Sequence, residues 1–104
     1  MDPFAAVSER LLAEPDVTAG TGFGSRGGLR CGGKIFAIRL EDALVVKLPA
    51  ARCRRLLADG AVLPWDRGKG TPLQEWVAVP ERDAVDWSGF AGEALAYARS
   101  QASR

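Results

Sequence analysis

The run from residue 34 to residue 48 constrains the fold most strongly, because its apolar side chains recur with the period of two that is typical of a strand. Alternation over residues 34–40 predicts a strand with two faces, Phe36, Ile38 and Leu40 on one face and Ile35, Ala37 and Arg39 on the other. Glu41 and Asp42 supply a polar turn, and a second strand over residues 43–48 shares one face among Leu44, Val46 and Leu48. The pair predicts an antiparallel hairpin.

The rest of the chain predicts helices on both sides of this hairpin. Apolar spacing indicates an N-terminal helix over about residues 3–13, a short helix over residues 50–58 and a final helix from Asp83 or Asp86 toward Ser100. We expect short strands with tight turns over residues 17–33, a surface loop over residues 62–72 and a last strand over residues 73–79. This order predicts an α+β fold, a two-layer sandwich whose antiparallel sheet of about five strands carries the N-terminal helix and the C-terminal helices on one face.

Length and charge limit what such a fold can do. At 104 residues the chain has room for one hydrophobic core, so we expect a single domain over residues 1–104. With 14 basic and 13 acidic residues the formal net charge is +1, so any basic surface has to be a local patch. No apolar run approaches the ~20 residues of a membrane helix, and the charged N-terminal stretch does not resemble a signal peptide. We therefore expect a cytoplasmic protein that does not contact a membrane.

Residue types that usually carry catalysis are scarce. The chain has no histidine, which removes the usual general base and metal ligand. Cys31 and Cys53 lie too far apart in sequence for a CxxC motif, and reduced thiols are the simpler interpretation. We therefore expect no enzyme activity, no cofactor and no bound metal.

The glycine-rich run GFGSRGGLRCGGKI, residues 22–35, matches two phosphate-binding patterns. Gly22 to Gly27 fits GxGxxG, and Gly28 to Lys34 fits GxxxxGK without its final Ser or Thr. Both patterns need a helix N-terminus after the loop, whereas the alternation after Lys34 predicts a strand. We therefore expect the glycines to serve turns and bulges between short strands rather than a nucleotide site.

Several short motifs, in order along the chain, resemble the N-terminal domain of the TfoX/Sxy family. They are Phe23-Gly24, Gly28-Leu-Arg, Gly33-Lys-Ile-Phe-Ala, Leu44-Val-Val-Lys-Leu-Pro49, Glu75-Trp76-Val, Trp87 and Glu93-Ala94. Together they cover residues 4–98, nearly the whole chain. The Gly-Lys-x-Phe-Ala and Lys-Leu-Pro motifs of the hairpin are also similar, more distantly, to MmcQ/YjbR-like domains.

This resemblance implies a bacterial α+β sandwich with helices on one side of an antiparallel sheet and no catalytic motif. Full-length TfoX-like proteins are competence regulators that act with a cyclic-AMP receptor protein and carry a second, C-terminal helical domain. We expect this chain to be a stand-alone N-terminal domain of that kind, linked to transcription or competence regulation.

The first site hypothesis is a non-enzymatic regulatory or protein-interaction module whose partner is another protein. Its candidate contact residues are Trp65, Arg67 and Lys69 in the predicted loop, because an aromatic ring beside a guanidinium is a common interface anchor. In the alternative interpretation Trp65 covers one end of the core and the charges merely solvate a loop. A monomer and a weak dimer through an exposed sheet edge both fit the sequence.

Two further hypotheses use the basic residues. Nucleic acid could bind through Arg52, Arg54 and Arg55, joined by Arg30, Lys34 and Lys47, although such a run is also typical of a solvated helix face. A small anion could bind at Arg30 and Lys34, with Cys31 between them made reactive by a lowered pKa. The alternative for Cys31 is an ordinary, half-buried strand thiol.

Overall fold

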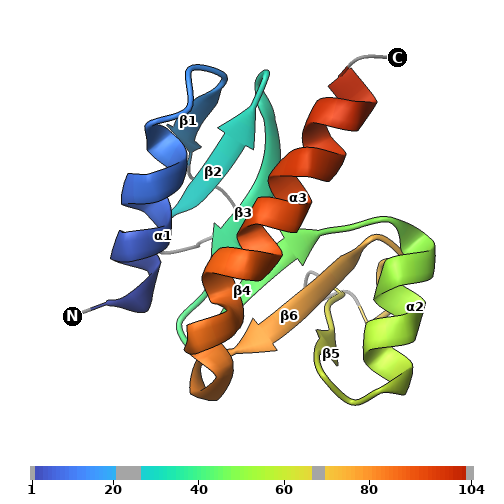
Figure 1. Cartoon of the computed structure of the whole chain (residues 1–104). Helices are drawn as coiled ribbons and strands as arrows, with labels where there is room; N and C mark the ends of the chain where they lie inside the picture. Colours follow the sequence, from blue (N-terminus) through green and yellow to red (C-terminus); the bar gives the residue numbers. More distant parts are fainter. Residues whose placement is uncertain (1, 21–26, 67–69, 103–104) are drawn as a thin grey trace.

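The computed structural model describes residues 2–20, 27–66 and 70–102, and it confirms the α+β class (Figure 1). The helices are α1 (Pro3–Leu12), α2 (Ala50–Ala58) and α3 (Trp87–Ala102), and a 3-10 helix, η1 (Glu81–Asp86), lies directly before α3. The strands are β1 (Val17–Gly20), β2 (Gly28–Cys31), β3 (Lys34–Arg39), β4 (Ala43–Lys47), β5 (Leu63–Pro64) and β6 (Trp76–Pro80). Each predicted helix is present, and α2 has the predicted bounds.

The strands form one antiparallel sheet in the order β1-β2-β3-β4-β6-β5. The predicted central hairpin is confirmed as β3 and β4, with Arg39 opposite Leu44 beside the turn. After β4 the chain leaves the sheet as α2 and returns through β5 and β6, so that β6 pairs with β4 along the whole strand. The sheet has more strands than expected, because the two-residue strand β5 lies in the predicted loop.

The turn between β2 and β3 explains part of the glycine-rich run. Cys31 pairs with Lys34, and Gly32 and Gly33 between them have φ angles of 59° and 84°. Two successive positive φ angles are typical of the two-residue turn that matches the twist of a hairpin. A strand therefore begins at Lys34, as predicted, and the near-match to a phosphate loop is not followed by a helix. Of the GxGxxG match, residues 22–26 lie outside the described residues.

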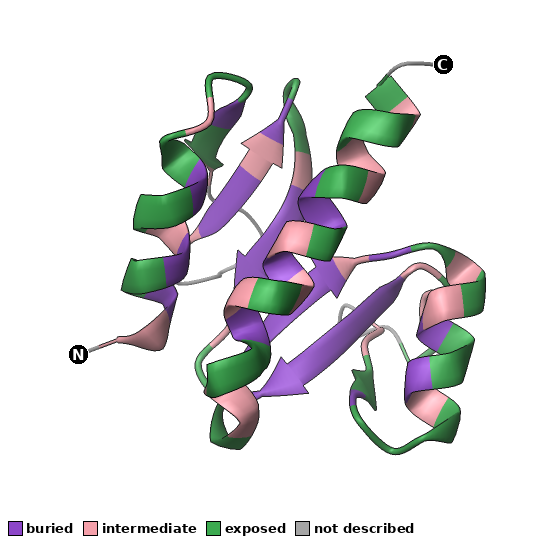
Figure 2. Ribbon diagram, in the orientation of Figure 1, coloured by how far each residue is buried: buried purple, intermediate pink, exposed green. Residues whose placement is uncertain are grey.

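All three long helices cover the same face of the sheet, and Figure 2 shows the buried stripes of α1 and α3 turned toward it. Pro3 opens α1, and the Asp2 side chain accepts a hydrogen bond of 3.3 Å from the Phe4 N–H, the usual geometry of an N-cap. We call the buried residues between helices and sheet the helix-side core. Its main side chains are Phe4, Val7, Leu11, Leu29, Phe36, Leu44, Val46, Leu48, Val77, Val79, Trp87 and Leu95.

Strand β3 departs from the predicted alternation. Leu29 pairs with Ala37 while Arg30 pairs with Ile35, so one extra residue, Phe36, is inserted in β3 as a β-bulge. Phe36 and Ala37 both pack in the helix-side core, whereas Ile38 packs on the other face. The prediction that Phe36, Ile38 and Leu40 share a face is therefore wrong, because a bulge shifts the side-chain period by one residue.

The second face of the sheet carries a smaller apolar cluster, which we call the outer cluster. Its buried members are Ile38, Ala43, Val45, Trp76 and Ala78, with Ile35, Leu40, Trp65 and Leu73 packed against it. Part of the predicted 62–72 loop thus covers apolar sheet residues. The last strand begins at Trp76 rather than Leu73, but the predicted alternation of Trp76 and Ala78 with Val77 and Val79 is confirmed.

Candidate functional site

The loop residues predicted to bind a partner are described only at Trp65, since Arg67 and Lys69 lie outside the described residues. Trp65 is half-buried, and its ring centroid lies 5.5 Å from that of Trp76, with the planes tilted by 57°. Tilted aromatic pairs at this separation stabilise packing beyond the area that they bury. Trp65 therefore contributes to the outer cluster, whether or not it also contacts a partner.

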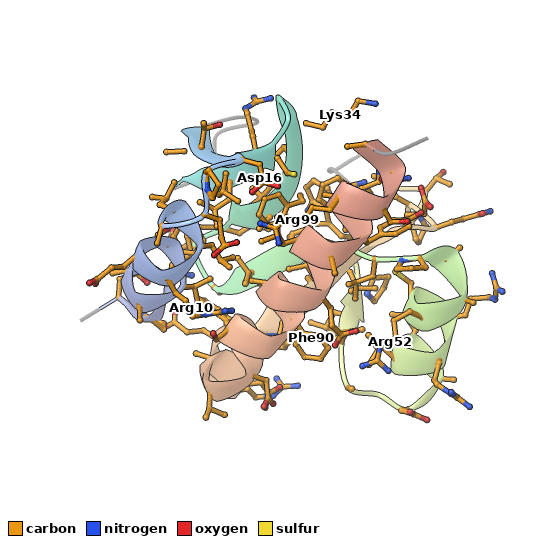
Figure 3. The ribbon with its side chains drawn as sticks, turned by 45° about the horizontal axis from the view of Figure 1, so that its top comes forward. Arg10, Asp16, Lys34, Arg52, Phe90 and Arg99 are labelled. Carbon is orange, nitrogen blue, oxygen red and sulfur yellow. The ribbon has the colours of Figure 1, made fainter. Side chains whose placement is uncertain are left out.

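The three arginines of α2 are not equivalent. Arg52 forms a bidentate ion pair with Glu93 of α3, at 3.0 and 3.2 Å, and Figure 3 shows its side chain on the α3 side of α2. This pairing raises the pKa of Arg52 above its ordinary value. Arg54 and Arg55 are exposed. The structure thus leaves two of the three arginines open to solvent, while the third already binds a carboxylate.

Arg30 and Cys31 point to opposite faces of the sheet. Cys31 belongs to the helix-side core, so its neighbour Arg30 lies on the second face, where its guanidinium donates to the Gly33 carbonyl at 3.1 Å. Burial and the carboxylate of Asp16, whose Oδ2 lies 3.6 Å from Sγ, raise the pKa of the Cys31 thiol. The hypothesis of a lowered pKa at Cys31 is wrong, because burial and the negative charge of Asp16 both disfavour the thiolate.

Asp16 is held by an arginine from the other end of the chain. The guanidinium of Arg99 in α3 contacts both carboxylate oxygens of Asp16 at 2.8 Å and Glu14 at 2.7 Å (Figure 3). The side-chain hydrogen bonds from Arg99 lower the pKa of Asp16 to about 2. This cluster holds the segment between α1 and β1 against α3. Because Arg99 pairs with Asp16 and Glu14, these three charges are balanced within the protein rather than available to a ligand.

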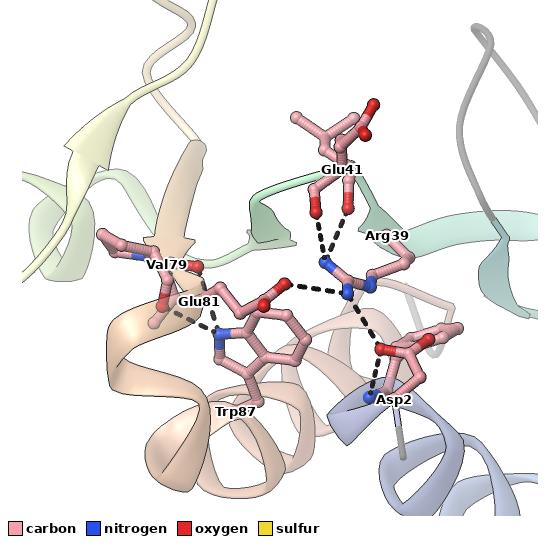
Figure 4. A network of polar contacts seen from close by, with 9 residues as sticks. Asp2, Arg39, Glu41, Val79, Glu81 and Trp87 are labelled. Atoms are coloured by element: carbon pink, nitrogen blue, oxygen red, sulfur yellow. Dashed lines mark hydrogen bonds and ion pairs between the residues drawn. The ribbon is translucent and has the colours of Figure 1, made fainter.

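Arg39 is a buried charge that the sequence hypotheses did not single out as functional. Its exposed fraction is 2%, and its guanidinium lies 4.8 Å from the centre of the Trp87 ring (Figure 4). It donates to Asp2 at 2.8 Å, to Glu81 at 3.0 Å, and to the carbonyls of residues 40 and 41. Burial alone would lower the pKa of Arg39, but the hydrogen bonds to the two carboxylates raise it. An arginine at the end of a strand whose preceding four residues are apolar was the signal in the sequence.

A groove of about 400 Å³ opens beside β5 on the second face of the sheet. Its floor and walls are mainly apolar and are formed by Leu40, Ala43, Leu63, Pro64, Ala78 and Pro80. Leu63 keeps 50% of its surface exposed, which makes it one of the few large apolar side chains of the described residues that face water. Asp42, Glu81 and Arg82 form the charged part of the lining. We call this feature the β5 groove.

Among the described residues, no group of acidic and cysteine side chains is arranged to hold a metal ion. None of the described helices is both long and apolar enough to cross a membrane. Comparison of the chain with protein-family models, with curated proteins and with solved structures finds no match.

Proposed function

We propose that the protein is a non-enzymatic regulatory module of the bacterial cytoplasm that binds another protein through the β5 groove. The observation that carries this proposal is the half-exposed Leu63 above a mainly apolar groove on the sheet face that the helices leave open. Apolar surface of this kind, rimmed by polar residues, is typical of protein-interaction sites. The resemblance to TfoX N-terminal domains supports a role in transcription or competence regulation.

The charges around the groove favour a basic partner. Glu81 is paired with Arg39 at 3.0 Å, and Arg82 lies 3.8 Å from Asp83, so these charges are largely balanced. Asp42 lines the groove and Glu41 lies next to it, both exposed at the β3–β4 turn. The remaining negative charge complements an apolar segment that carries a lysine or arginine beside its anchor side chain.

The partner segment binds through side chains rather than by extending the sheet. β5 is two residues long and ends in Pro64, which has no N–H to donate to an added strand. Apolar side chains of the partner therefore enter the groove from the solvent side, and Leu63 lies at the margin of the groove.

A cross-linking experiment in cells tests this proposal. A photoreactive amino acid replaces Leu63 in one variant and Leu12 in the control; Leu12 is 40% exposed on α1, away from the groove. We expect an adduct at position 63 that is absent at position 12, whose cross-linked peptide combines aliphatic and basic residues. Loss of the adduct in an Asp42→Lys background is expected too.

Three results would contradict the proposal. They are equal adducts at positions 63 and 12, no adduct at position 63, and an adduct whose cross-linked peptide is acidic. Direct nucleic-acid binding is the competing function, and titration of a labelled duplex at low salt measures it. Tight binding to the duplex that Arg54→Glu abolishes while Leu63→Glu leaves it intact would replace the protein partner with nucleic acid.

A further inference from the structure

A second hollow lies at the opposite end of the central hairpin, where β3 begins and β4 ends. It measures about 290 Å³, and β3, β4 and the last turns of α3 form its walls. Lys34 and Lys47 line it together with the side-chain amide of Gln101. Ile35, Ala98 and Ala102 supply an apolar wall. We call this feature the lysine cavity.

Its two lysines differ from the arginines that hold the structural ion pairs. Arg39, Arg52 and Arg99 are each bound to carboxylates, whereas within residues 2–20, 27–66 and 70–102 neither Lys34 nor Lys47 forms an ion pair. The lysines come from adjacent strands and both line the hollow, Lys34 as an exposed and Lys47 as a half-buried residue. An anion in the hollow would be attracted by both positive charges.

Among the described residues, the other charges near the lysine cavity leave its field positive. Asp16 lies against Cys31 in the cavity wall, but Arg99 neutralises it, and the raised pKa of the Cys31 thiol keeps that group uncharged near neutral pH. Glu75 accepts a hydrogen bond from Tyr97, and it lines a neighbouring hollow together with Lys47. The C-terminal end of α3 contributes the equivalent of about −0.5 charge, which is smaller than the charge of either lysine.

We propose that the lysine cavity binds a small organic anion that carries one carboxylate or phosphate group on a short apolar body. Lys34 and Lys47 hold the charged group, as point charges with several donors each. Ile35, Ala98 and Ala102 contact the apolar body, and the Gln101 amide, which donates to the Tyr97 hydroxyl at 3.2 Å, provides a polar contact at the margin. This site is separate from the β5 groove and does not depend on the proposed partner.

NMR titration of the whole chain tests the site, with the backbone amide of Gly32 and the side-chain amide of Gln101 as reporters. Butyl phosphate and hexanoate are the probes, and butanol is the neutral control. We expect saturable shifts of both reporters with the two anions and none with butanol. Tighter binding of butyl phosphate identifies a phosphate ligand, and tighter binding of hexanoate identifies a carboxylate.

Variants connect the shifts to the two lysines. Lys34→Gln and Lys47→Gln should each weaken binding about tenfold, the usual effect of losing one charged hydrogen-bond donor. Arg55→Gln removes an exposed charge on α2 and should change nothing, whereas Glu75→Gln should strengthen binding by removing a nearby negative charge. Absent saturation, equal binding of butanol, or equal weakening by Arg55→Gln would overturn the inference, and the amide spectrum itself shows whether each variant is folded.

Discussion

The buried guanidinium of Arg39 provides the sharpest test of how this fold is stabilised. Its two carboxylate partners, Asp2 and Glu81, come from the N-terminus and from η1, so the network ties both to the end of β3 (Figure 4). Asp2→Asn and Glu81→Gln each remove one negative charge and keep an acceptor oxygen. The asparagine also preserves the N-cap of α1, because it is an equally good N-cap residue.

The geometry sets the expected magnitudes. The Arg39 side chain is 3% exposed, but those of Asp2 and Glu81 are 37% and 51% exposed, so solvent screens each pair. Each single substitution leaves one carboxylate on the guanidinium and should lower the free energy of unfolding by about 1 kcal/mol. The double substitution leaves a buried cation without any carboxylate, and it should cost about 3–5 kcal/mol, which exceeds the sum of the singles.

Urea unfolding followed by tryptophan fluorescence and by circular dichroism measures these differences. The matched control is Glu93→Gln, which breaks the Arg52 pair between side chains that are 39% and 42% exposed, and it should cost less than about 1 kcal/mol. Additivity of the two singles within about 0.5 kcal/mol would refute the reasoning, because independent contributions mean that Arg39 does not need a remaining carboxylate.

Three further predictions concern the rest of the molecule. Gly28→Ala should lower the free energy of unfolding by about 1–3 kcal/mol, since the added Cβ would lie 2.9 Å from a backbone oxygen of β3, whereas Gly89→Ala meets nothing within 4 Å and should be neutral or stabilising in urea unfolding. Asp16 should titrate near pH 2 by NMR and return toward 3.8 in Arg99→Gln, so its pair with Arg99 stabilises the fold above about pH 4 and this contribution is lost as the pH falls toward 2. Both cysteines are buried with raised pKa values, so a thiol reagent at neutral pH should label them much more slowly in the native protein than in urea; fast native labelling of either would contradict this.

Local patterns predicted most of this fold, because the apolar residues of most helices and strands follow one regular spacing, helical or alternating, along the whole element. Helix α1 has an apolar face with Pro3 at its start, and α2 ends where Gly60 adopts a φ of 72°. The faces of β4 and β6 follow strict alternation, and their side chains divide between the two apolar clusters as predicted. In each case the residues within one element carry the information.

The features that the sequence did not predict depend on pairings between elements. The bulge at Phe36 arises from the register between β2 and β3, and no residue of β3 alone marks it. Leu63 and Pro64 form β5 only because the edge of β6 lies beside them; in isolation two residues with a proline look like a loop. The β5 groove was missed for the same reason, since the β3–β4 turn, β4, β5, β6 and η1 each contribute to it.

The candidate sites were predicted in part, and the hairpin register explains which part. Lys34 was proposed as an anion ligand with its near neighbour Arg30, but the structure places Lys47 beside Lys34 in the cavity, while Arg30 lies on the second face of the sheet. Arg30 and Lys34 are only four residues apart in the sequence, which suggested proximity, but the turn at Gly32 and Gly33 places them on different strands. The first residue of β3 and the last of β4 line the same cavity because antiparallel pairing brings the open end of a hairpin together.

A residue can test the proposed partner site only if it contributes little to the packing of the protein itself. Trp65 was the expected anchor, but its ring packs on Trp76 in the outer cluster, so Trp65→Ala would remove core contacts and lower stability along with any binding. Leu63 lies two residues before it in the sequence, with half of its surface in water. A charge at position 63 can therefore abolish partner binding while the free energy of unfolding changes little, and only a residue with that property separates a loss of function from a loss of fold.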